Sequence, residues 1–169
     1  MLLPHDAEET IGYIFSDAES KVGILTDCGY DSAEVAAAFA GCDVLALETN
    51  YDQTMLQAGP YPPTLKRRVG GSRGHLSNDQ AASLLKLICK AGPAPKLVIA
   101  AHLSQLNNRP ALAKSALEKT LRGLGARVEV ATQPRPTPTF TAASGQVQIQ
   151  PLPGSQLSLF APPLARLRS

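Results

Sequence analysis

Two short apolar runs constrain the fold of this chain more than any other feature of its sequence. "VLALE" covers residues 44–48 and "LVIAA" covers residues 97–101. An apolar run of this length without polar alternation is typical of a strand that is buried on both faces. Segments with helical patterns surround both runs, so strands and helices alternate along the chain. This order predicts an α/β layered fold rather than a helix bundle or an all-β sandwich.

The segments around these runs predict the remaining strands and two of the helices. The expected elements are a hairpin of residues 11–15 and 22–26, helices at 32–40 and 52–58, and a last core strand at 127–132. Asp31 and Glu34 have the spacing of a capping box for the first helix, and Gly41 ends it.

Two longer helices are predicted from their caps and apolar faces. Ser77 and Gln80 form a capping box, and the inward face of that helix is expected to contain Ala81, Leu84, Leu85 and Ile88. Asn108 and Pro110 open the other helix. Its expected inward residues are Leu112, Ala116, Leu117 and Leu121.

The proline content changes after residue 133. Half of the chain's 14 prolines follow this point, although it leaves only the last part of the 169 residues. We therefore predict a folded domain over residues 1–133 and a proline-rich tail over residues 134–169. Within the tail, "TFTAASGQVQIQ" could form one small hairpin around Ser144 and Gly145.

Charge and cysteine content exclude some classes of protein. The formal net charge is only +2, so a role in binding nucleic acid would require a local cluster of basic residues. The three cysteines form no CxxC spacing, and an odd number fits a reducing cytosol better than secretion. No apolar run approaches the length of a membrane span, and no targeting segment is visible. We expect a cytoplasmic protein that does not enter membranes.

The three histidines of the chain each lie beside the end of a strand or the cap of a helix. His5 precedes the predicted hairpin, His75 precedes a capped helix, and His102 ends a strand, while Asp27 ends another strand. Zinc and manganese accept imidazole nitrogen and carboxylate oxygen, and loops at strand ends can bring distant residues together. From spacing alone, each histidine is either a metal ligand or an ordinary hydrogen-bonded residue.

Four segments in order resemble one family of hydrolases: "PHDAEETIGYIF", "GILTDCGY", "LALETNYDQTMLQAGPYPPTLKRRVGGSRGHLSN" and "VIAAHLSQLNN". Together they are similar to the second half of metallo-β-lactamase-fold hydrolases. The branch they resemble is the YycJ/WalJ-like, exonuclease-like group, which is related to ribonuclease Z and ribonuclease J. The resemblance runs from about His5 to about Gln133. It implies an αββα sandwich of which this chain would supply the second half.

The resemblance also implies roles for the histidines and Asp27. In that family two divalent metal ions, zinc or manganese, activate a water against a phosphodiester. His5 would bind one metal, His102 the other, and Asp27 would lie between them. His75 resembles the family's phosphate-contacting histidine, a candidate proton donor to the leaving oxygen. Residues 107–108 are expected to shape the turn that aims His102.

The family's HxHxDH signature, which supplies most of the metal ligands, precedes the His5 motif, and this chain starts four residues before His5. The resemblance therefore implies that the main metal loop is absent from the chain. We expect the chain alone to bind metal weakly and to hydrolyse nothing at a useful rate. A non-catalytic remnant or binding module, or a thioester or lactam hydrolase of the same superfamily, remain alternatives.

A basic cluster favours nucleic acid, with DNA preferred over RNA, as the substrate class. "LKRRVGGSRGH" places four cations near His75: Lys66, Arg67, Arg68 and Arg73. The guanidinium group of arginine can donate two hydrogen bonds to phosphate oxygens, and glycine-rich loops allow the backbone to approach a phosphodiester. The alternative is a solvated basic surface without a ligand.

A short motif in the tail resembles a known interaction motif. "QLSLF", residues 156–160, is similar to the pentapeptide with which bacterial polymerases and repair factors bind the DNA sliding clamp. The resemblance implies that Leu157, Leu159 and Phe160 enter an apolar pocket of the clamp while Gln156 hydrogen-bonds at its rim. The alternative is that these side chains pack back on the domain.

Overall fold

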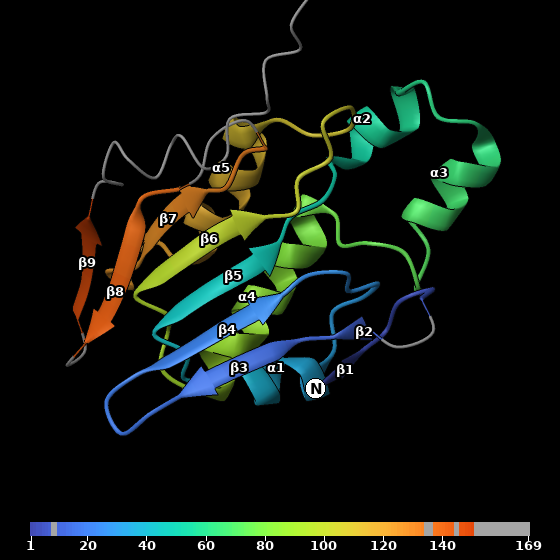
Figure 1. The fold of residues 1–169 in the computed structure, drawn as a ribbon. Coiled ribbons are helices and arrows are strands. Elements are labelled where there is room, and N and C mark those ends of the chain that lie inside the picture. Colours follow the sequence, from blue (N-terminus) through green and yellow to red (C-terminus); the bar gives the residue numbers. More distant parts are fainter. Residues whose placement is uncertain (8–9, 134–136, 144–145, 151–169) are drawn as a thin grey trace, which may run out of the picture.

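A five-stranded sheet forms the centre of the computed structural model, which describes residues 1–7, 10–133, 137–143 and 146–150 (Figure 1). The strands follow one another in the order β3 (Tyr13–Ser16), β4 (Lys21–Leu25), β5 (Val44–Glu48), β6 (Leu97–Ala101) and β7 (Arg127–Val130). β3 and β4 form an antiparallel hairpin, and β4 to β7 are parallel. The α/β class, the hairpin and both buried strands are confirmed.

Three helices cover one face of this sheet, as Figure 1 shows: α1 (Ala33–Phe39), α4 (Asn78–Ala91) and α5 (Pro110–Thr120). Two further short helices, α2 (Gln53–Ala58) and α3 (Pro63–Val69), follow β5 and lie beyond its carboxyl end. The helical side is therefore a packed layer, while the carboxyl edge of the sheet is built from loops and short helices.

The core lies between the sheet and its helical layer. Its fully buried members include Phe39, Leu45, Leu47, Leu84, Leu85, Ile88 and Val98. Gly23 permits close contact between β4 and α1, because a Cβ atom at Gly23 would lie only 2.7 Å from Cδ1 of Phe39. The predicted capping box of Ser77 and Gln80 is present at the start of α4.

Two helix predictions need correction, and one helix was missed. The N-cap of α1 is Ser32 rather than Asp31, and the Ser32 side chain accepts a hydrogen bond from the amide of Val35. In α5, Leu112 is exposed and Ala116 is only partly buried, whereas Ala113 is buried together with the expected Leu117 and Leu121. These three residues are spaced by four and share one face, whereas Leu112 is rotated away by about 100°. Helix α3 was not predicted.

The opposite face of the sheet carries no helix among the described residues. Tyr13 and Phe15 on β3 are more than half exposed there, with their rings stacked 6.3 Å apart, and Ile24 on β4 is also exposed. As far as the described residues show, the sheet is packed on one side and exposed on the other.

Two small two-stranded sheets complete the described structure. β1 (Leu2–Leu3) pairs with β2 (Thr10–Ile11), and β8 (Thr139–Ala143) pairs with β9 (Gln146–Gln150) in the predicted hairpin. The described helices include none with the length and hydropathy needed to cross a membrane. The motif at 156–160 lies outside the described residues.

Candidate functional site

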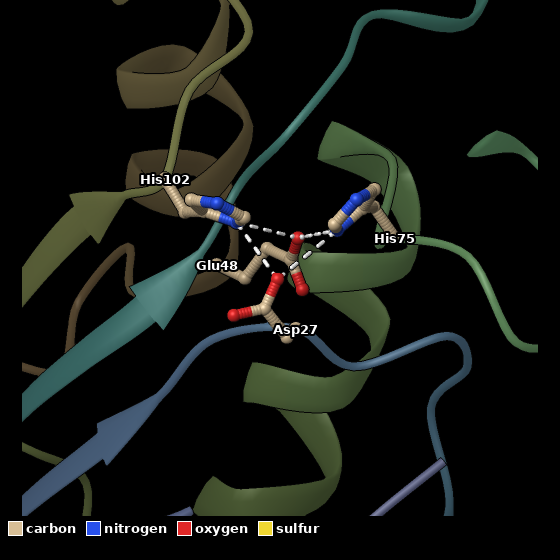
Figure 2. A group of neighbouring side chains, drawn as sticks. All are labelled: Asp27, Glu48, His75 and His102. Carbon is tan, nitrogen blue, oxygen red and sulfur yellow. Dashed lines mark hydrogen bonds and ion pairs between the residues drawn. The ribbon is translucent and has the colours of Figure 1, made fainter. Parts of the chain in front are cut away.

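Four side chains of the kinds that bind metal ions meet at the carboxyl edge of the sheet: Asp27, Glu48, His75 and His102 (Figure 2). Asp27 follows β4, Glu48 ends β5, and His102 follows β6, because parallel strands end at the same edge of a sheet. His75 comes from the loop between α3 and α4. One ligand atom from each of these four residues lies within 4.8 Å of the others.

Glu48 is the centre of this cluster, and no part of its side chain is exposed. Its Oε1 lies 2.7 Å from Nδ1 of His75 and 3.1 Å from Nδ1 of His102 (Figure 2). Its Oε2 accepts a hydrogen bond of 2.7 Å from the amide of Cys28. A carboxylate can only accept, so both rings donate from Nδ1 and keep Nε2 as a possible metal-binding atom.

Asp27 faces all three histidines. Its Oδ1 lies 3.8 Å from Nε2 of His5 and 3.7 Å from Nδ1 of both His75 and His102. Nδ1 of His5 donates to the carbonyl of Gly74 at 2.8 Å, and Nε2 of His5 lies between Asp27 and Asp6, whose Oδ1 is 3.3 Å away. The structure thus brings His5, Asp27, His75 and His102 close to one another, while their metal-binding and catalytic roles stay predictions.

Asp27 and His102 both have left-handed backbones, with φ values of 60° and 57°. This region is unfavourable for residues other than glycine, and such strain is found where a site fixes the chain. The hydrogen bond from the backbone amide of Cys28 to Glu48 holds the turn that contains Asp27. The side-chain amide of Asn50 donates to the carbonyl of His102 at 2.9 Å and anchors the other turn.

Sequence reasoning assigned no role to Glu48 or Asn50. The available signal was an acidic residue that ends an otherwise apolar run, "VLALE", followed closely by an asparagine. A carboxylate buried without partners would be costly, so its position at the end of a buried strand predicts hydrogen-bonding neighbours.

Glu48 and His102 shift each other's pKa values. Burial raises the pKa of Glu48, but hydrogen bonds from His102, His75 and the Cys28 amide outweigh burial and hold this pKa below its usual value. The hydrogen bond to Glu48 raises the pKa of His102, against the opposing effect of burial. The charged forms of both side chains are therefore favoured together.

These shifts predict a pH dependence for the metal-free protein. Glu48 stabilises the fold above its usual pKa of 4.5, and this contribution is lost as pH falls through its lower folded value. His102 stabilises the fold below its usual pKa of 6.5, and this contribution is lost as pH rises through its higher folded value. The pair should therefore stabilise most between these two values. Urea unfolding with a chelator present should show that the free energy of unfolding falls as pH rises above this range. The fall should be smaller in His102→Gln, and an equal fall in both proteins would contradict the pairing of Glu48 with His102.

The basic residues near His75 lie on and after α3. Arg68 forms an ion pair with Asp6, and Arg73 donates from Nε to the carbonyl of His5 at 3.1 Å. Nζ of Lys66 donates to the carbonyl of Gln57, and Arg67 is exposed. Arg68 and Arg73 thus fasten the His5 segment to α3, a structural role that the sequence did not indicate.

The parallel strands with imidazoles and carboxylates at their carboxyl ends define an α/β protein whose donor set fits a divalent metal ion. Residues 2–103 match the family described as the beta-lactamase superfamily domain. The chain belongs to that superfamily and has the metallo-β-lactamase fold. The metallo-β-lactamase fold protein YhfI from Bacillus subtilis superposes with a TM-score of 0.56 at 14% identity, over 78% of this chain and 44% of that chain.

Two curated relatives are similar in sequence. The exodeoxyribonuclease YycJ of Bacillus anthracis is 34% identical over 121 residues, which are 72% of this chain and 45% of that protein. The exodeoxyribonuclease WalJ of Streptococcus pneumoniae strain D39 is 33% identical over 117 residues, or 69% of this chain and 43% of that protein. The chain thus spans a little under half the length of these relatives, and the homology to this branch agrees with the sequence resemblance.

Proposed function

We propose that this chain forms part of a metal-dependent phosphodiester hydrolase that acts on nucleic acid as an exonuclease in DNA repair. The observation that carries the proposal is the convergence of three histidines on Asp27 in a chain homologous to two exodeoxyribonucleases. The basic surface of α3 beside this cluster supports a polyanionic substrate.

His5, Asp27 and His102 are the side chains that would hold two divalent ions, zinc or manganese. The donor types fit, because Nε2 of His5 lies beside the carboxylates of Asp27 and Asp6, and His102 keeps Nε2 available while its Nδ1 donates to Glu48. When bound, such ions polarise a phosphoryl oxygen and lower the pKa of water. The three side chains offer few ligands for two ions, so we expect further ligands from another segment.

The residues around the ions would orient the reacting groups. Glu48 fixes the ring of His75 through Nδ1, so that its other nitrogen can be aimed at the phosphodiester. In its protonated form, His75 would give a proton to the leaving oxygen, the role of a general acid. Asn50 and Cys28 hold the turns that position His102 and Asp27.

A fusion tests this function. The part of the Bacillus anthracis relative that this chain does not cover would be placed before residue 1, and cleavage of end-labelled DNA and RNA would be measured with manganese or zinc. We expect metal-dependent cleavage of DNA by the fusion and little by the chain alone. A folded, metal-loaded fusion that cleaves neither polymer would contradict the proposal, and hydrolysis of thioesters or lactams instead would favour the alternative. Chelator-sensitive turnover by the chain alone would contradict the need for further ligands.

We also propose that residues 156–160 bind the bacterial DNA sliding clamp. The support is the sequence alone: "QLSLF" matches the pattern of the motif, and prolines surround it. An extended peptide can place two apolar side chains in a pocket, and tethering would raise the local concentration of DNA at the enzyme.

The clamp proposal predicts binding by a peptide of residues 151–163. Calorimetry should give a dissociation constant of about 1 μM to 10 μM for the clamp of the same organism. Leu159→Ala combined with Phe160→Ala should cost about 3 kcal/mol by removing two buried apolar side chains. A Ser158→Ala peptide serves as a control and should bind like the native peptide. No heat at tens of micromolar native peptide would refute the proposal.

A further inference from the structure

Three cavities lie in a row along the carboxyl edge of the sheet. The middle cavity, of about 600 Å³, contains the candidate metal site. It shares residues 102–105 and Gln133 with a cavity of about 700 Å³ beside α5. In the other direction it shares His5, Val69 and His75 with a cavity of about 210 Å³ beside α3. Within the described residues the two outer cavities share no lining residue, so the row has two separate ends.

The cavity beside α5 has the chemistry of a site for one nucleoside. Leu103 offers an apolar wall, while Gln105, Thr132 and Gln133 offer amide and hydroxyl groups. Among the described residues that line this cavity, Arg109 adds a guanidinium group. A nucleobase has apolar faces and a hydrogen-bonding edge, and a guanidinium plane can stack on it. The volume lies within the usual range for small-molecule sites.

The loop that forms this cavity is held in place by hydrogen bonds. The amide of Ser104 donates to the carbonyl of Asn50 at 2.8 Å, and the amide of Asn107 donates to Oγ of Ser104 at 3.1 Å. The buried side chain of Asn108 donates to the carbonyl of Thr49 at 2.8 Å. A wall fixed in this way needs little ordering when a ligand binds.

The end beside α3 has a different character. Four cations, Lys66, Arg67, Arg68 and Arg73, lie on α3 or in the loop after it. Arg68 lines the small cavity together with its ion-pair partner Asp6, while Arg67 is exposed. Several adjacent cations can contact successive phosphates of a nucleic-acid strand, whereas the cavity beside α5, with one arginine, can contact a single nucleotide. The two ends therefore differ in the length of nucleic acid that each can hold.

We propose that the terminal nucleoside of the substrate strand occupies the cavity beside α5, while the rest of the strand crosses the candidate metal site and runs over α3. This inference rests on the proposed function and adds the direction of the strand across the site. It also assigns Arg109 and Gln105 to recognition of the terminal base and Arg67 to the phosphate backbone.

Binding measurements on the 169-residue chain, with a chelator present to prevent cleavage, test the proposal. Deoxyadenosine monophosphate should shift amide NMR signals of residues 102–109 and 131–133, and Arg109→Ala should weaken its binding about tenfold. Arg67→Ala should leave mononucleotide binding unchanged. For a single-stranded oligonucleotide, Arg67→Ala should lower the salt slope of binding by about 0.7, the value for one lost phosphate contact. Arg122→Ala removes an exposed arginine after α5 and is the matched control.

Four results would overturn the proposal: mononucleotide shifts centred on α3, no mononucleotide binding at millimolar concentration, equal shifts from inorganic phosphate alone, or no effect of both Arg109→Ala and Gln105→Ala. These results are separate from a failure of the proposed function. A fusion that cleaves nucleic acid but shows mononucleotide shifts on α3 would retain the function and reject the strand direction. Mononucleotide binding at 102–109 without any cleavage would reject the function alone.

Discussion

Asp27→Asn is expected to lower the nuclease rate of the fusion by about a thousandfold or more, the scale of loss on removing a central catalytic group. The carboxylate of Asp27 faces all three histidines, so any ion held there would lose its shared ligand. Asparagine is the informative replacement because it tolerates the left-handed backbone found at this position. The fold should therefore be kept while the charge is lost.

Two readouts separate this effect from misfolding. The urea midpoint of Asp27→Asn should stay near that of the unchanged protein, and calorimetric titration with zinc or manganese should show weakened binding. Asp17→Asn makes the same chemical change in the β3–β4 turn, where Asp17 accepts hydrogen bonds from Glu19 and Ser20. This control should keep its cleavage rate. If Asp27→Asn cleaved at the wild-type rate, the assignment of Asp27 to the catalytic metal site would be wrong.

Short-range patterns predicted only where some of the site residues lie, because their roles at a metal site were implied by the family resemblance. Asp27 and His102 follow strands that apolar runs reveal, and strand ends in a parallel sheet meet at one edge. The role of Glu48 was not predictable from local sequence, because its hydrogen-bond partners Cys28, His75 and His102 are 20 to 54 residues away. Only the completed sheet and the loop after α3 bring those donors to one carboxylate.

The fold shows the same division between local and distant information. The capping box at Ser77 was predictable because its hydrogen bonds join residues three apart. The inward face of α5 was not, since both Leu112 and Ala113 start apolar rows along that helix and only contact with the sheet decides between them. The pairing of Arg68 with Asp6 spans 62 residues and has no local pattern.

Glu48→Gln is expected to lower the free energy of unfolding of the metal-free chain by about 1 to 3 kcal/mol near pH 6, the cost of leaving one hydrogen-bonding group unpaired, because Glu48 is buried but the side chain of His102 is 39% exposed. Glutamine is nearly the same size but has only one accepting oxygen. It can accept from the two imidazoles or from the Cys28 amide, and not from both sides. One group of donors would be left without its partner.

The same substitution should also weaken metal binding, because outer carboxylates that orient histidine ligands contribute about 10-fold to 100-fold in affinity. Urea unfolding and zinc titration measure the two effects separately. Glu118→Gln is the matched control, since Glu118 lies exposed on α5 beside Lys114, where such pairs contribute less than about 1 kcal/mol. A Glu48→Gln protein as stable as this control would mean that Glu48 does not organise the site. Lost stability with unchanged zinc affinity would mean that it supports the fold but not the position of His102.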